Sequence, residues 1–89
     1  MIQEIRKVQL ETETFVKNEM ADIYSRELIE LLFEQPYCKI SFLVDRHIAK
    51  KQTASKYLNR LVAAGLLDKI KQGREYYFIN KNLWEILTR

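Results

Sequence analysis

The side chains best suited to chemistry in this sequence are grouped between residues 50 and 64, where amides, hydroxyls and positive charges share one face of an expected helix. Amide and guanidinium groups can hydrogen-bond base edges in the DNA major groove, whereas most protein–DNA hydrogen bonds reach the phosphate backbone. An ordinary amphipathic helix with a solvated basic face has the same composition. The expected base-proximal residues are Gln52, Thr53 and Lys56, with Asn59 or Arg60, and the expected phosphate contacts are Lys50, Lys51 and Ser55.

The other face of this segment is apolar, which predicts a helix over about 50–64. Apolar side chains that recur at helical spacing share one face and need to be buried, and Gly65 supplies the positive φ angle that ends a helix. Two short apolar-rich runs follow and are joined at Gly73, which is typical of a β-hairpin over 66–79. The residues of the buried face are Ala54, Tyr57, Leu58, Leu61 and Val62.

The predicted hairpin is itself basic. Lys69, Lys71 and Arg74 flank Gly73, the expected tip, so they could reach an adjacent DNA groove or its phosphates. Lysines on an edge strand also deter aggregation, and this role needs the same residues. A basic hairpin directly after a helix of this kind is the core of a winged helix-turn-helix.

Two helices are predicted before this region. A loose apolar stripe predicts a long helix over 2–21, and a denser one predicts a helix over 24–34, which Pro36 stops because the residue before a proline leaves the helical region. Asp22 or Ser25 could cap the second helix. The stripes comprise Ile2, Ile5, Val8, Phe15, Val16 and Met20, and then Ile23, Leu28, Leu31 and Leu32, widened by Ile29 and Phe33.

Short elements complete the expected structure. Residues 38–40 should be extended beside the hairpin, and Ser41 should cap a short helix over 42–47. Asn80 should cap a last helix over 81–88. The side chains expected in or near the core are Phe42, Leu43 and His47 from the short helix, Leu83, Trp84 and Leu87 from the last one, and Tyr76, Tyr77 and Phe78 from the hairpin.

Together these elements predict a mainly α fold with a small β-hairpin, namely a winged helix-turn-helix preceded by a long N-terminal helix. The 89 residues are 47% apolar and 30% charged, which is typical of one small globular domain. We divide them into a linker or interaction helix at 1–22 and a winged-helix domain at 23–89. Residues 1–34 carry a net charge of −4 and residues 46–74 carry +7, so a polyanion is expected on one surface and another partner elsewhere.

Other classes of function are disfavoured. Cys38 and His47 are the only residues of their types, so no disulfide or metal cluster is expected and both are interpreted as structural. The sequence has no recognisable catalytic constellation and no glycine-rich phosphate loop, so neither an enzyme nor a cofactor is expected. Without a membrane-length apolar run or a signal peptide, the expected location is the cytoplasm.

Two stretches resemble the C-terminal winged-helix domain of Fic-family proteins, which are AMP-transferring enzymes. They read YSRELIELLFEQPYCKI (24–40) and VDRHIAKKQTASKYL (44–58). The resemblance covers about residues 23–89 and implies that residues 1–22 correspond to the helical link from a catalytic domain. The family's catalytic loop is similar to HPFxDGNGR, and nothing here matches it, since Ile48 follows His47. AMP transfer is therefore assigned to no residue of this chain.

Two functions are compatible with this sequence. The first is a module that binds double-stranded DNA and regulates transcription, for example of its own operon, or places an enzyme on DNA. The second is a regulatory module without DNA binding, which docks on a Fic catalytic domain or forms a homodimer through residues 1–22. The fold does not decide between them. The charge division favours DNA, and the apolar residues of the first helix favour protein contacts.

Overall fold

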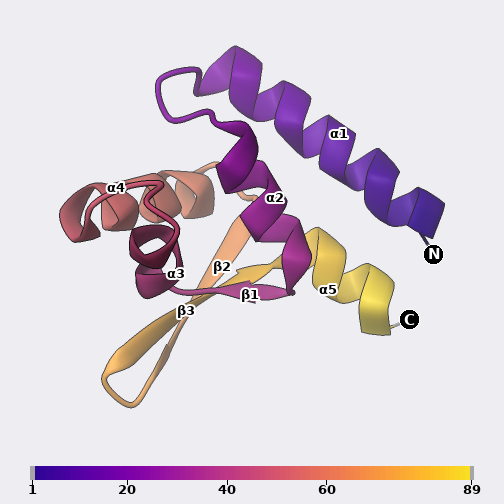
Figure 1. Cartoon of the computed structure of the whole chain (residues 1–89). Coiled ribbons are helices and arrows are strands. Elements are labelled where there is room, and N and C mark those ends of the chain that lie inside the picture. Colours follow the sequence, from indigo (N-terminus) through magenta and orange to yellow (C-terminus); the bar gives the residue numbers. More distant parts are fainter. Residues whose placement is uncertain (1, 89) are drawn as a thin grey trace.

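The computed structural model describes residues 2–88 and contains a helical body from which a β-hairpin projects (Figure 1). Its element order confirms the predicted fold class, a mainly helical winged helix-turn-helix that follows a long first helix. The helices are α1 (Ile2–Glu19), α2 (Arg26–Glu34), α3 (Ile40–Asp45), α4 (Lys51–Ala63) and α5 (Lys81–Thr88), and the strands are β1 (Tyr37–Cys38), β2 (Leu67–Gln72) and β3 (Glu75–Asn80).

The strands form an antiparallel sheet in the order β1-β3-β2. The hairpin turns at Gly73 and Arg74, between β2 and β3, and Gly73 has a φ of 65°. Two-residue hairpin turns need this left-handed conformation, which glycine adopts without strain. Cys38 of β1 pairs with Phe78 of β3, which confirms the predicted extended segment beside the hairpin, although α3 already begins at Ile40.

One hydrophobic core connects all the early elements with the sheet. Phe78, Leu28, Leu43 and Leu58 are among its largest fully buried side chains, one each from β3, α2, α3 and α4. Helix α1 adds Val16 to the same cluster, followed by Met20 just beyond its last residue. The first helix is therefore packed on the winged-helix core along its C-terminal half.

The buried line of α1 differs from the predicted stripe. Thr12 is buried and Phe15 is 39% exposed, because positions 12, 16 and 20 recur every four residues and position 15 is rotated to the edge of that line. Ile5 and Val8 are partly buried, and the side chain of Ile2 lies outside the described residues. A polar residue on the line thus hides the true face of this helix.

Ser25 caps α2. Its hydroxyl oxygen accepts a hydrogen bond from the Leu28 backbone N–H at 3.1 Å, which satisfies one of the free donors of the first turn. Of the two predicted candidates the structure therefore selects Ser25, while Asp22 lies in the preceding turn and bonds elsewhere.

The predicted start and end of α3 were wrong. The chain passes from β1 directly into the helix at Ile40, so Lys39 occupies the N-cap position without a side-chain cap bond, and Ser41 lies inside the first turn. His47 lies beyond the end of α3, is exposed, and adopts a φ of 58°. The histidine is a turn residue and does not contribute to the core.

Asn80 confirms its predicted role at the start of α5. Its Oδ1 accepts a hydrogen bond from the Leu83 N–H at 3.3 Å, and its Nδ2 donates to the Leu32 carbonyl at 3.0 Å. A buried amide with both ends bonded fixes the last helix against α2 and the sheet.

The aromatic residues near the C-terminus are less buried than predicted. In α5 the buried side chains are Leu83 and Ile86, whereas Trp84 is 50% exposed and Leu87 is also exposed. In β3, Phe78 is fully buried, whereas Tyr76, two residues nearer the hairpin tip on the same face of the strand, is exposed. Tyr77 is half-buried. These apolar surfaces were predicted to close the core, but the core is already complete without them.

Candidate nucleic-acid interface

Helix α4 is held by its apolar side, which leaves its basic side toward solvent. Ala54, Leu58 and Leu61 have no exposed surface and anchor the helix in the core. Tyr57 and Val62, also predicted on this face, are half-buried at its margins. The residues of the opposite side divide into an exposed set, Lys51, Gln52, Thr53 and Lys56, and a half-buried set, Ser55, Asn59 and Arg60.

The N-terminal half of α4 is open. Lys50 is the N-cap residue and makes no side-chain cap bond, so the first backbone N–H groups and the positive end of the helix dipole remain available to an anion. Within residues 2–88, no carboxylate forms an ion pair with Lys50, Lys51 or Lys56. We define Lys51, Gln52, Thr53 and Lys56 as the open face of α4.

The C-terminal half of the same polar side is occupied by contacts within the chain. Arg60 forms an ion pair and hydrogen bond with Asp22 from the turn before α2. The Arg60 guanidinium, through this hydrogen bond, lowers the pKa of the Asp22 carboxyl, and the charge of Lys56 lowers it further. The same bond raises the pKa of Arg60. Arg60, a predicted base contact, is therefore paired with a carboxylate of the same chain.

Asn59 is also engaged. Its Nδ2 donates to the Ser55 hydroxyl at 3.3 Å, and its Oδ1 accepts from the Lys69 ammonium at 3.0 Å. Lys69 belongs to β2, so this bond connects α4 to the wing, meaning the β2–β3 hairpin. The predicted sites Ser55, Asn59 and Lys69 are therefore brought together, but as a brace between two elements.

The rest of the wing extends its charges outward. The Lys69 ammonium lies 4.4 Å from the centroid of the Tyr76 ring and that of Lys71 lies 5.8 Å from it. Both distances fit cation–π contacts. Lys71 and Arg74 are exposed and form no ion pair with any described residue. The wing thus places two available charges beside the open face of α4.

Two residues of this surface were missed by the sequence interpretation. Asp22 lies 38 positions before Arg60, and no local pattern indicates such a contact. Tyr76 was predicted in the core, although strand alternation placed it on the same side of the hairpin as Lys69 and Lys71. That alternation was the signal that could have identified it.

The remaining candidates have no such surroundings. Cys38 is buried, and this burial raises the pKa of its thiol to about 12, so the thiol is unreactive at neutral pH. Among the described residues, no group of three His, Cys, Asp or Glu side chains could hold a metal ion. No helix in the same range has the length and apolar character needed to cross a bilayer.

The sequence also matches a family of known proteins. A family model described as the C-terminal domain of SoFic-like protein adenylyltransferases matches residues 8–83, from the first helix to the start of the last. The match spans most of the chain and confirms the predicted resemblance to Fic-family proteins. It describes a C-terminal domain and not a catalytic one. With its winged-helix fold and the extent of this match, the chain belongs to the family of SoFic-like protein adenylyltransferase C-terminal domains.

Proposed function

We propose that this chain is a non-catalytic module that binds double-stranded DNA, with the open face of α4 in the major groove and the basic wing on adjacent phosphates. The open face carries the proposal, because Lys51, Gln52, Thr53 and Lys56 are exposed, unpaired within the described chain, and flanked by Lys71 and Arg74. A helix-turn-helix docks in this way, with the N-terminal residues of its second helix against base edges. The role would be regulation of transcription, or placement of an attached adenylyltransferase on DNA.

The test is the affinity for a labelled random-sequence duplex, measured by fluorescence anisotropy over a series of salt concentrations. Replacing Lys51 and Lys56 together by Ala should weaken binding by about tenfold or more and reduce the slope of log K against log salt by about two. The matched control is Arg6→Ala with Lys7→Ala, which removes the same charge from the exposed side of α1. Equal effects of the two pairs, or no salt-dependent binding by the wild type, contradict the proposal.

A second function is favoured by the first helix. Leu10 is 63% exposed and Phe15 39% exposed on α1, and exposed apolar side chains suit a protein partner. The partner would be a Fic catalytic domain or a second copy of the chain, bound through residues 1–22.

Oligomeric state by light scattering tests this second function for the homodimer. Leu10→Ser with Phe15→Ser should convert a dimer to a monomer, whereas Trp84→Ser, an equally exposed control on α5, should not. Deleting residues 1–21 is a poorer experiment, because Val16 and Met20 belong to the core. A wild type that is monomeric at high concentration contradicts the homodimer.

A further inference from the structure

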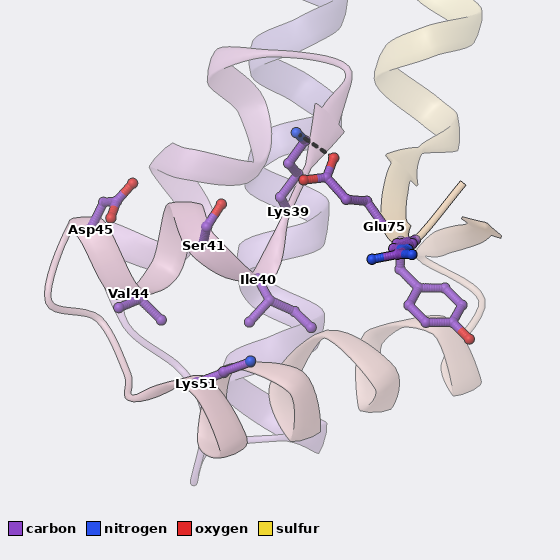
Figure 2. Close-up of a pocket in the computed structure, with 9 residues that line it drawn as sticks. Lys39, Ile40, Ser41, Val44, Asp45, Lys51 and Glu75 are labelled. Carbon is purple, nitrogen blue, oxygen red and sulfur yellow. Dashed lines mark hydrogen bonds and ion pairs between the residues drawn. The ribbon is translucent and has the colours of Figure 1, made fainter. Parts of the chain in front are cut away.

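A groove of about 540 Å³ lies between α3, the start of α4 and the wing (Figure 2). Its floor is apolar, since Ile40 and Val44 of α3 point into it and Tyr76 of β3 lines it. Lys51 from α4 and Arg74 from the wing tip line the same groove. Three elements that are separate in sequence therefore build one apolar channel with two cationic side chains.

The charges of the groove favour an anion. Glu75 lines it but is neutralised by Lys39, whose ammonium lies 2.9 Å from a carboxylate oxygen of Glu75, and the two meet at one rim in Figure 2. Asp45 lies at the far end of α3 with its carboxylate turned away from the floor (Figure 2). Lys51 and Arg74 have no ion-pair partner among the described residues. The net charge offered to a ligand is positive.

Tyr76 is held in place before any ligand arrives. Lys69 and Lys71 contact its ring as cations, and Lys69 is itself bonded to Asn59 of α4. The side chain remains 40% exposed, and its hydroxyl forms no hydrogen bond with the described residues. A fixed aromatic ring with a free hydroxyl can pack on an apolar surface and donate to an anion at the same time.

We propose that this groove seats one sugar–phosphate strand of bound DNA, with phosphates on Lys51 and Arg74 and a deoxyribose packed against Tyr76 and the floor of α3. Alternating anionic phosphates and weakly polar sugars match alternating cations and apolar surface. The inference rests on the proposed function and adds Tyr76 and the α3 floor to the residues that contact DNA.

The experiment compares Tyr76→Ala with Tyr37→Ala in the same anisotropy titration. Tyr37 is 37% exposed and belongs to the same sheet, but it lies opposite Ile79, on the other face from Tyr76. Tyr76→Ala should weaken duplex binding about five- to tenfold, as expected for losing the apolar contact of one ring and one hydrogen bond, with the salt slope unchanged. Tyr76→Phe, which keeps the ring, should lose no more than about threefold, and Tyr37→Ala should bind like the wild type.

The outcomes separate the groove from the wider function. If the wild type binds and Lys56→Ala weakens binding while Tyr76→Ala does not, the groove is overturned and the role of α4 stands. If Tyr76→Ala and Tyr37→Ala lose affinity equally, the effect is general destabilisation and the groove is again overturned. If the wild type shows no salt-dependent binding, the proposed function itself fails. If Tyr76→Ala does not fold, Tyr76→Phe and Arg74→Ala test the groove in its place.

Discussion

The two halves of α4 carry similar polar side chains but have different surroundings. Lys51 and Lys56 in the N-terminal half are exposed and unpaired within the described chain, whereas Arg60 in the C-terminal half is bonded to Asp22 and Asn59 to Lys69. The first half is open to a ligand without any rearrangement. The second half must first break contacts within the chain. Composition alone therefore overstates how much of a basic helix is available to a polyanion.

The largest expected effect comes from removing what holds both halves in place. Leu58 is fully buried under the middle of α4, so Leu58→Ala should lower the free energy of unfolding by about 2–5 kcal/mol. Urea denaturation measures this loss. Leu10→Ala, at an exposed position, should change stability by no more than about 0.5 kcal/mol. A small effect at Leu58 would mean that α4 does not depend on the core.

The next largest effect is expected from single substitutions that compare the two halves of α4. Lys56→Ala should weaken duplex binding about five- to tenfold and reduce the salt slope by about one. Arg60→Ala should change affinity less than about twofold, because its charge is already compensated by Asp22. Anisotropy titrations at several salt concentrations measure both. Equal losses from the two variants would show that Arg60 leaves Asp22 on binding.

Releasing Arg60 should make the second half resemble the first. Asp22→Asn removes the compensating carboxylate, so duplex affinity should rise about two- to threefold and the salt slope should steepen by up to about one. In this background Arg60→Ala should cost affinity that it does not cost in the wild type. A double-mutant cycle measures this coupling, and strict additivity would contradict the compensation.

Lowering the pH should have the smallest effect, and it acts through the same Asp22–Arg60 ion pair. The Asp22 carboxyl has a pKa lowered from 3.8 by the Arg60 hydrogen bond. Its contribution to stability is therefore present above that unfolded value and is lost as the pH falls through the folded value. The difference in unfolding free energy between the wild type and Asp22→Asn should shrink from pH 7 to pH 3 and below. A difference independent of pH would assign it to something other than the ion pair.

The parts of the fold that follow from local patterns could be predicted. Helical spacing located α4, Pro36 located the end of α2, and the two runs around Gly73 located the hairpin with its tip. In each case the signal lies within a few residues of the element it determines. The N-cap at Asn80 is of the same kind.

The main errors concern contacts between segments that are distant in sequence. Trp84 was expected in the core, but whether an aromatic side chain in α5 is buried depends on how much room α1 and the sheet leave. Ser41 is a good capping residue by type, yet the incoming direction of β1 starts α3 two residues earlier than predicted. The engagement of Arg60 by Asp22 belongs to the same class, because only packing brings the turn after α1 against α4.

That turn connects α1 to the C-terminal half of α4 through residues 20–23. Met20 is anchored in the core, and Asp22, two residues later, holds Arg60. A shift of α1 that carries this turn with it would displace the carboxylate that neutralises Arg60, and, by reciprocity, a ligand that captures Arg60 would remove the contact of this turn with α4. A load on the first helix would thus change the free energy needed to free the Arg60 side chain of α4 from Asp22.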